Sequence, residues 1–359
     1  MGYLRPPTSM TTKRVLIGAA QAPFINGGAE MLVLSLQREL RQRGFLADVA
    51  QVPFKWYPPE EIVRQALAWR LIDVTESNGD KIDLFIATKF PTFLAEHSCK
   101  VAWIFHQHRE VYDLFGTEYC SFTDSKEHQE TKATIHSLDT KTLSECRDRF
   151  TISRTVSDRL RHFNGLDSTP LYPPPPLSGR YRFEELGDFL LFAGRLDRLK
   201  RVDLLIDALT HTPKDVRLKI AGRGPLEGML RERAEASGVS TRVDFLGFVP
   251  DEDLLTLLAT ARAAVYTPVN EDYGYVTLEA FLSGKTLVTT NDTGGVLEFA
   301  TSESGFISAP TAAGLGAEMT RAWNTPKTRL REMAEVGRKK VAPIQWDSVI
   351  DTLTEQIRK

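Results

Sequence analysis

Short runs of apolar and β-branched residues alternate along the chain with longer stretches in which apolar residues recur every three or four positions. The short runs are typical of buried strands and the periodic stretches of amphipathic helices. Their alternation predicts βαβ units, and therefore parallel sheets covered by helices. In the first half of the chain we expect strands at 13–20, 45–52, 83–88, 100–106, 150–153 and 169–172, and helices at 29–43, 60–71, 126–147 and 155–163.

Four consecutive prolines, Pro173 to Pro176, interrupt this rhythm. They fix an extended backbone that neither a helix nor a central strand can absorb, so they predict a domain boundary. Beyond them the pattern restarts, with strands expected at 188–193, 216–221, 242–246, 263–266 and 286–290, each followed by a helix. The fold class is α/β, and we assign 1–172 to an N-terminal Rossmann-like domain, 173–187 to a linker, 188–343 to a C-terminal Rossmann-like domain, and 344–359 to a C-terminal helix, with packing back on the first domain as one option.

Length and composition agree with two soluble domains. The chain has 359 residues, more than one hydrophobic core usually serves. Its formal net charge of −2 offers no basic field for nucleic acid. The three cysteines match neither a disulfide framework nor a zinc site. No apolar run reaches the roughly 18 residues that span a membrane, so we expect a cytoplasmic protein, with the inner face of the membrane as an alternative location.

One stretch bears on that alternative. Residues 60–72 are amphipathic and contain Trp69 and two arginines, as an interfacial helix would. Two leading glutamates favour a helix packed within the domain, and peripheral membrane contact is the alternative.

Unusual residues gather in the loops expected after the strands, where open α/β sheets bind their ligands. Gly27 and Gly28 lie at the turn from the first strand to the first helix, where a ligand can approach the helix N-terminus and a plain turn is the alternative. They lack the G-x-G-x-x-G spacing of a dinucleotide fingerprint. Arg195 and Lys200 follow the first strand of the second domain, where two cations can neutralise a pyrophosphate. A solvated basic loop is the alternative for this pair.

Two further loops carry weaker signals. Gly222 and Gly224 indicate a tight turn, with a nearby ligand as the alternative. The run Asp251-Glu252-Asp253 resembles a metal-binding motif, but acids in this position suit the start of a helix, with Asp251 as its cap. We therefore predict no metal site.

The segment 266–280 carries the strongest signal. Glu271 lies in a loop after a strand, and Glu279 falls one turn into the next helix, where a carboxylate can accept hydrogen bonds from a vicinal diol such as a ribose. Backbone amides at Gly274, Tyr275 and Val276 open that helix and can face a diphosphate. His106 ends an apolar strand, a position in which a structural role and a functional one both remain open.

Together these motifs resemble the retaining glycosyltransferases of family 4, which have the GT-B fold of two facing Rossmann-like domains and an interdomain cleft. The most specific part of the likeness is the pair Glu271 and Glu279 with seven residues between them, followed by Gly294-Gly295. Asp272 departs from the glycine that many members have. The resemblance implies these roles: Arg195 and Lys200 hold the donor diphosphate, Glu279 the ribose, and Glu271 the transferred sugar; Gly274, Tyr275 and Val276 lend amides; Gly247, Phe248 and Val249 lie along the base; Gly28 approaches the phosphates; His106 faces the sugar.

The same resemblance implies the reaction. A hexose, with GDP-mannose or UDP-glucose favoured as donor, would pass with retention to a hydroxyl of a saccharide or lipid-linked acceptor in cell-surface polysaccharide synthesis. The acceptor would attack on the face from which the diphosphate departs. The nucleotide sugar is a substrate, and neither a cofactor nor a metal is expected. A sugar-nucleotide epimerase of the same fold and a non-catalytic partner subunit are the alternatives.

Overall fold

The computed structural model describes residues 12–23 and 27–358, which group into two compact units. The first unit comprises Met1–Ile152, Val156–Pro173 and Trp346–Lys359. The second comprises Ser153–Thr155 and Pro174–Gln345. The division between the two long segments therefore falls within the run of four prolines, and the linker residues 174–187 group with the second unit.

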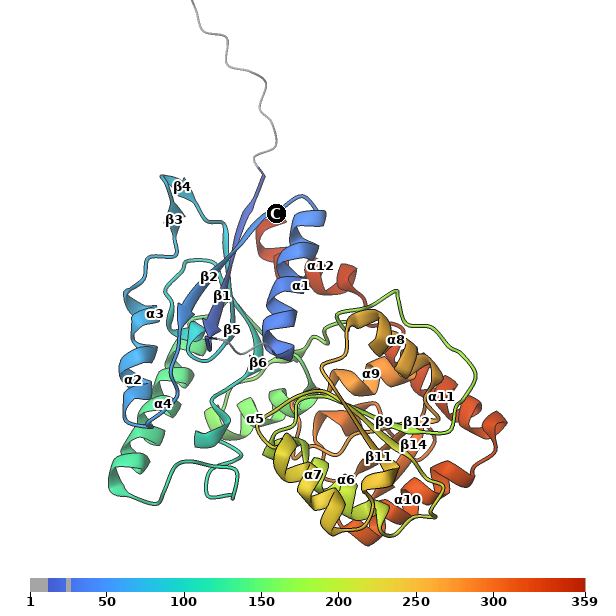
Figure 1. Cartoon of the computed structure of the whole chain (residues 1–359). Coiled ribbons are helices and arrows are strands. Elements are labelled where there is room, and N and C mark those ends of the chain that lie inside the picture. The colour runs from blue at the N-terminus through green and yellow to red at the C-terminus, as the bar shows by residue number, and fades with distance from the viewer. Residues whose placement is uncertain (1–11, 24–26, 359) are drawn as a thin grey trace, which may run out of the picture. The chain divides into compact units, whose positions relative to one another are not determined.

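The first unit is built on a six-stranded parallel sheet with the order β2-β1-β5-β6-β7-β8. Helices α1 and α12 contact each other, and α2 contacts α4 (Figure 1). A small antiparallel pair, β3 and β4, lies outside the main sheet. The strands are β1 (Arg14–Gln21), β2 (Leu46–Pro53), β3 (Glu76–Ser77), β4 (Asp80–Lys81), β5 (Leu84–Lys89), β6 (Lys100–His106), β7 (Asp148–Thr151) and β8 (Thr169–Pro170); the helices are α1 (Gly28–Gln42), α2 (Glu61–Ala66), α3 (Ala68–Leu71), α4 (Lys126–Ser144), α5 (Arg154–Asn164) and α12 (Trp346–Arg358).

The core of this unit lies around β5 and β6, which are buried along almost their whole length. Trp103 is fully buried in β6, and its ring meets that of Trp346 edge-on at 6.2 Å. The apolar face of α12 is thereby buried, although the helix lies at the other end of the chain. Arg43 of the segment after α1 also pairs with Asp347.

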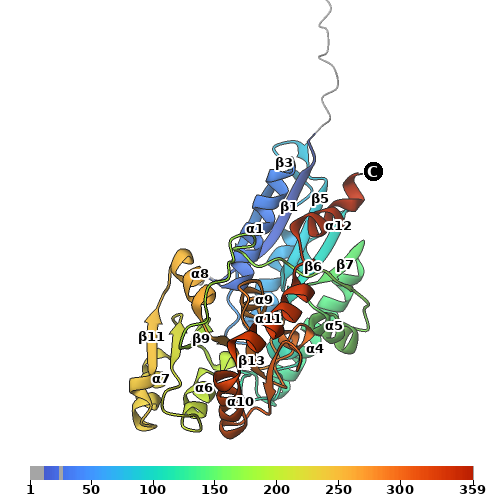
Figure 2. The same cartoon turned by 90° about the vertical axis from the view of Figure 1, so that its right-hand side faces the viewer.

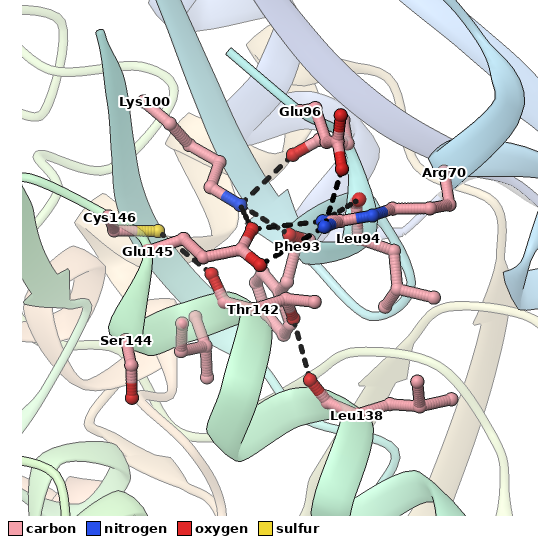
Figure 3. A network of polar contacts seen from close by, with 12 residues as sticks. Arg70, Phe93, Leu94, Glu96, Lys100, Leu138, Thr142, Ser144, Glu145 and Cys146 are labelled. Atoms are coloured by element: carbon pink, nitrogen blue, oxygen red, sulfur yellow. Dashed lines mark hydrogen bonds and ion pairs between the residues drawn. The ribbon is translucent and has the colours of Figure 1, made fainter. Parts of the chain in front are cut away.

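A fully buried lysine, Lys100, lies at the start of β6 (Figure 3). Lys100 Nζ donates to the carbonyl oxygens of Phe93 and Ala95, both at 2.9 Å, and lies 3.1 Å from Glu145 Oε2. Arg70 reaches the same Glu145 carboxylate at 2.9 Å. Because a buried ammonium needs partners for each of its donors, this network joins β6, α3 and the end of α4.

The second unit has a six-stranded parallel sheet with the order β11-β10-β9-β12-β13-β14. In both views α6, α7 and α10 lie on one face of this sheet, and α8, α9 and α11 lie on the other (Figures 1 and 2). It is therefore doubly wound. The strands are β9 (Leu190–Ala193), β10 (Leu218–Ala221), β11 (Val243–Gly247), β12 (Ala263–Val265), β13 (Leu287–Thr290) and β14 (Gly305–Ser308); the helices are α6 (Val202–Leu209), α7 (Glu227–Ala236), α8 (Asp251–Thr260), α9 (Tyr275–Leu282), α10 (Ala312–Asn324) and α11 (Lys327–Val341).

Several expected elements differ from the structure. The strand at 286–290 is followed by a short 3₁₀ turn, Gly295–Glu298, and not by an α-helix. A sixth strand, β14, was missed because its four residues give too little pattern. The helix expected at 126–147 ends at Ser144, since the chain then turns into β7 and Arg147 N donates to Lys100 O at 2.8 Å.

The helix expected at 60–71 is also wrong as one piece. It divides into α2 and α3 at Leu67, and Trp69 is fully buried. An indole inside the domain core cannot insert into a bilayer, which removes the residue on which the interfacial interpretation rested. Within the described part of the chain, no helix is both long and apolar enough to cross a membrane.

Candidate active site

The order of strands in the second unit locates its binding edge. Counted along the chain within this unit, the order is 3-2-1-4-5-6, and it reverses between β9 and β12. In open α/β sheets, ligands bind outside the carboxyl ends of the strands at such a reversal. The loops that follow β9 and β12 are therefore the place to look for chemistry.

These two loops are joined by an ion pair. Lys200 ends the 3₁₀ turn Arg198–Lys200 after β9, and its ammonium pairs with Glu271, which follows β12. Lys200 Nζ also lies 3.0 Å from the hydroxyl oxygen of Tyr266. The side chains of Lys200 and Glu271 are 19% and 20% exposed, so solvent screens them little.

The pair determines the ionisation of its members. Burial opposes the charged form of Lys200, but the neighbouring Glu271 carboxylate outweighs it and holds the pKa of this lysine above its usual range. Burial, together with the same carboxylate, raises the pKa of Tyr266. Lys200 therefore stays cationic throughout the physiological range, as a group that binds phosphate oxygens must.

Arg201 fixes the loop that carries Lys200. Its backbone is left-handed, with φ 48°, which turns its side chain toward β12 and β13. The guanidinium makes two hydrogen bonds of 2.7 Å to Asp292 and donates to the carbonyl oxygen of Thr267 at 2.8 Å and to that of Pro268 at 3.0 Å. These contacts tie the residue before α6 to the segments that follow β12 and β13, so Arg201 holds the loop of Lys200 in place.

Glycines bring the backbone around Glu271 into close contact. Glu271 pairs with Gly294 in an isolated parallel bridge, and Gly295 N donates to Glu271 O at 2.7 Å. Gly274 has φ 78° at the start of α9, and a Cβ there would lie 2.9 Å from Val296 Cγ2. A side chain at Gly274 is therefore excluded both by conformation and by space. The departure at Asp272 leaves this geometry in place.

The start of α9 is an anion-binding element in form. Tyr275 and Val276 are its first residues, and amides in the first turn of a helix have no acceptor within the helix. The positive end of the helix dipole adds to them. These backbone groups lie next to Glu271 in the chain, as expected from the motif.

Glu279 lies one turn further along α9 and has different neighbours. Its Oε1 accepts a hydrogen bond of 3.2 Å from the hydroxyl of Tyr181. Burial raises the pKa of Glu279 to about 7; the Tyr181 hydroxyl lowers it and the charge of Asp251 raises it further. Near neutral pH this carboxyl group is thus close to its own midpoint.

The loops after β9, β10 and β11 interlock through their backbones. Gly194 N donates to Ala221 O at 2.9 Å, and Gly222 N donates to Gly247 O at 2.8 Å. A Cβ at Gly222 would lie 1.8 Å from Gly194 O, so this close approach requires glycine. A Cβ at Gly224 would likewise lie 2.2 Å from Leu196 O, so the turn requires glycine at both positions.

The residues expected along the base lie at the end of β11 and directly after it. Gly247 has φ 66°, Phe248 is 69% exposed, and Val249 packs against a buried cluster that includes Leu191 and Leu258. The exposed ring of Phe248 beside this half-buried backbone turn offers a flat surface of the kind that a planar base requires.

Arg195 has a different environment from Lys200. Its side chain is 47% exposed, and its Nε lies 3.7 Å from Asp197 Oδ2. Among the contacts of the described residues, Arg195 is thus paired with Asp197, and the structure does not place it with Lys200 and Glu271.

The acidic run at the start of α8 differs from expectation in one detail. Pro250 occupies the N-cap position and Asp251 is the first helical residue, so Asp251 is not the cap. The three acids lie in the first turn, where their negative charges interact favourably with the positive end of the helix dipole. Among residues 12–23 and 27–358, no group of three or more His, Cys, Asp and Glu side chains is arranged to hold a metal ion.

Two predicted residues lie in the first unit. Gly28 begins α1, and Gly27 N donates to Glu30 Oε2 at 2.9 Å. The other oxygen of Glu30 pairs with Lys89, at the end of β5, at 2.6 Å. His106 ends β6, is partly buried, and has its Nδ1 3.0 Å from Gln107 O. The sequence did not indicate the pair of Glu30 and Lys89, because 59 residues separate its members.

Sequence reasoning also missed Tyr181, Arg201 and Tyr266 as members of the site in the second unit. Arg201 and Tyr266 stand within the motifs already singled out, beside Lys200 and ahead of Glu271. Tyr181 has no such signal, because it follows the prolines in a segment without pattern.

A separate hollow of about 390 Å³ lies in the first unit, beside the network of Lys100. Its lining includes Arg70, Glu96 and Glu145, which are already paired with one another. Its charged groups are thus satisfied by protein partners, and it contains none of the predicted site residues.

Comparison with known proteins supports the predicted class. Residues 178–340 match the family described as Glycosyl transferases group 1. Glycogen synthase of Mycobacterium tuberculosis is 27% identical over 241 residues, which are 62% of this chain and 56% of that protein. A GDP-mannose-dependent alpha-(1-6)-phosphatidylinositol dimannoside mannosyltransferase of the same species is 36% identical over 120 residues, 32% of this chain and 30% of that protein. The chain therefore spans little more than half of the first relative and less of the second.

Solved structures confirm the fold class, two parallel-sheet Rossmann-like domains of the GT-B type. Sucrose-phosphate synthase from Thermosynechococcus elongatus has a TM-score of 0.76 at 15% identity, covering 96% of this chain and 98% of that one. HepE of Anabaena, in complex with UDP and glucose, has a TM-score of 0.70 at 17% identity, covering 95% of this chain and 100% of that one.

Proposed function

We propose that this protein is a retaining glycosyltransferase that moves a hexose from a nucleoside-diphosphate sugar to a hydroxyl of a saccharide or lipid-linked acceptor. The observation that carries the proposal is the ion pair of Lys200 and Glu271 at the reversal of the second sheet, next to the amides that open α9. A cation, a carboxylate and a helix N-terminus at one edge suit a substrate that joins a diphosphate to a sugar.

In this mechanism Lys200 stabilises the charge that develops on the departing diphosphate. Its ammonium is held by Tyr266 and by the loop that Arg201 fixes, so it needs little rearrangement during the reaction. The amides of Tyr275 and Val276 add neutral donors for the same oxygens. The half-exposed side chain of Arg195 would turn from solvent toward the bound diphosphate and donate hydrogen bonds to it.

Glu271 has a positioning and electrostatic role toward the transferred sugar. Its carboxylate is a hydrogen-bond acceptor, and its charge favours the positive character that the anomeric carbon gains as the bond to the diphosphate breaks. The acceptor hydroxyl attacks on the same face, and its proton passes to the departing phosphate. This route retains the anomeric configuration without a covalent intermediate on the protein.

The donor is proposed to be GDP-mannose or UDP-glucose. The relatives' names support both, since one of them is named as GDP-mannose-dependent and a structural neighbour holds UDP and glucose. A role in cell-surface polysaccharide synthesis is part of the same proposal. An epimerase would need the same diphosphate site but no acceptor, and a non-catalytic subunit would show no transfer in any assay.

The test is thermal unfolding of the full chain with UDP, GDP, UDP-glucose and GDP-mannose, followed by transfer assays with the donor that binds. A ligand at 100 times its Kd stabilises the fold by about 2.7 kcal/mol, which raises the midpoint visibly. We expect Lys200→Ala to lower the transfer rate by about 10²–10³, because it removes a charge partner of the departing diphosphate.

Lys214→Ala serves as the matched control, since it removes an exposed lysine from the same unit. Transfer by Lys200→Ala at the wild-type rate would refute the assignment. Incubation with UDP-GlcNAc and no acceptor tests the epimerase alternative, because only an epimerase would convert this sugar nucleotide into its epimer.

A further inference from the structure

The hydroxyl of Tyr181, in the segment that follows the prolines, donates to Glu279 across 98 residues of sequence. Resting on the proposed function, we propose that Tyr181 is a positioning residue that holds the Glu279 carboxylate in place to accept the ribose hydroxyls of the donor. The linker would then take part in donor recognition as well as joining the two units.

Tyr181 is held in place by its packing. Its ring lies against the buried cluster formed by β9, β10 and α8, the same cluster that Val249 covers. The residues on either side are fixed to α8, because Arg180 pairs with Glu252 at 2.5 Å and Arg182 donates to Thr256 Oγ1 at 2.9 Å. Because the backbone on both sides of Tyr181 is already held, little further conformational entropy is lost when its hydroxyl is directed at the Glu279 carboxylate.

The hydrogen bond also selects how Glu279 can act. Tyr181 is bonded to Oε1, and no contact of Oε2 is found within residues 12–23 and 27–358, so Oε2 can accept from a ligand hydroxyl. The titratable groups around this carboxylate are Tyr181 from the linker, Tyr275 from its own helix and Asp251 from α8. None of these is a cation, so the Tyr181 hydroxyl is the group among them that favours the ionised form.

The Tyr275 hydroxyl adds a second observation. It is buried and has no hydrogen-bond partner among the described residues, and it lies one helical turn from Glu279. A buried hydroxyl without a partner is unfavourable, which indicates that this corner of the site is arranged for polar groups beyond those of the protein.

The test compares binding of ordinary and ribose-modified nucleotides by calorimetry. The probes are UDP and GDP, and their 2′,3′-dideoxy analogues, which lack the hydroxyls that Glu279 would accept. At pH 7 we expect Tyr181→Phe to weaken binding of the better ordinary nucleotide about fivefold, as for loss of one hydrogen bond. Binding of its dideoxy analogue should stay unchanged.

The pH dependence gives an independent readout. In the wild-type protein, affinity for the ordinary nucleotide should rise as pH rises through about 7, because the carboxylate form accepts the ribose hydroxyls. Tyr181→Phe removes a group that lowers the pKa of Glu279, so its rise should occur at higher pH. The difference between the two proteins should therefore shrink by pH 9.

Arg180→Gln is the matched control, since it loosens the same segment without removing the hydroxyl. It should bind both kinds of nucleotide as the wild type does. Equal weakening of ordinary and dideoxy nucleotides by Tyr181→Phe, or no weakening of either, would overturn the inference alone. Failure of the wild-type protein to bind any of the probes would overturn the proposed function on which the inference rests.

Discussion

Both units carry a Lys–Glu ion pair at the point where the strand order of the sheet reverses, but the pairs are held in different ways. In the first unit the reversal lies between β1 and β5, and Glu30 after β1 pairs with Lys89 at the end of β5. In the second, Lys200 after β9 pairs with Glu271 after β12.

The surroundings separate the two pairs. Both oxygens of Glu30 are taken, one by Lys89 and the other by Gly27 N, so the carboxylate closes the first turn of α1. Lys200 and Glu271 instead meet Tyr266 and lie beside glycines that keep side chains away. An ion pair at a sheet reversal is thus no sign of catalysis in itself. What distinguishes a binding site from a structural contact is the presence of groups beside the pair that can bind a ligand, here the amides at the start of α9.

The largest loss of stability is expected for the first pair. Lys89→Met should reduce the free energy of unfolding by about 3 kcal/mol at pH 7, because it leaves a mostly buried carboxylate without its cation. Burial raises the pKa of Glu30, but Lys89 and the amide of Gly27 outweigh this effect and hold the pKa below its ordinary 4.5. This contribution is therefore present above pH 4.5 and lost as pH falls below it.

Urea unfolding of the wild type and of Lys89→Met at pH 7 and pH 3.5 measures the effect. The gap between the two proteins should narrow at the lower pH. Lys81→Met removes an exposed lysine of the same unit and should leave stability within about 0.5 kcal/mol. A gap that is equally wide at both pH values would contradict the electrostatic explanation.

A smaller effect on stability, with a larger one on activity, is expected for Arg201→Lys. Lysine keeps the charge but cannot form the two-pronged contact with Asp292 while also reaching two carbonyl oxygens. We expect about 2 kcal/mol of lost stability and transfer slowed about tenfold or more, because Lys200 is displaced.

The assay for this variant is kcat and KM under saturating acceptor, alongside its unfolding curve. Arg201 supports the pair of Lys200 and Glu271 in the second unit, whereas the pair of Glu30 and Lys89 lies in the first. The loss of stability at low pH that is assigned to Glu30 should therefore be the same in Arg201→Lys as in the wild type. Transfer at the wild-type rate by a destabilised Arg201→Lys would show that the loop holds Lys200 without its neighbour.

The smallest effect on activity is expected for a buried carboxyl group of the first unit, which changes only the pH dependence of stability. Asp139 is fully buried, accepts from the Tyr112 hydroxyl at 2.7 Å, and its pKa is raised to about 7 by burial. The folded protein therefore holds a proton that the unfolded chain releases above about pH 4, so this group lowers stability as pH rises from there to about 7.

Asp139→Asn removes that dependence while keeping an acceptor for Tyr112. Relative to the wild type, the variant should gain up to about 4 kcal/mol of stability between pH 4 and pH 8, because about three pKa units separate the folded and unfolded forms of Asp139; thermal unfolding at both pH values measures it. Glu279 in the second unit has a similarly raised pKa beside the donor site, so Asp139 serves as its buried counterpart without access to a ligand. A variant whose difference from the wild type does not change with pH would contradict the raised pKa.

The local pattern was sufficient for most of the strands and helices. Short apolar runs in β5, β6 and the first five strands of the second unit predicted elements within a few residues of those observed. Predictions were wrong where the element was very short, as in β14, or where a tertiary contact redirected the chain, as after Ser144 and around Trp69. Propensity and periodicity are local properties, and these exceptions depend on partners far away in sequence.

The sequence by itself determined the two-domain α/β organisation, the prolines at its division and the motif that brings Glu271 and Gly274 to one helix start, because each depends on neighbours within one turn or loop. Only the tertiary structure decided that Lys200 pairs with Glu271, that Arg201 binds Asp292, and that Tyr181 donates to Glu279. Those contacts join residues 71 to 98 positions apart. They exist because parallel strands place their carboxyl ends at one edge, and no spacing in the chain encodes which side chains then meet there.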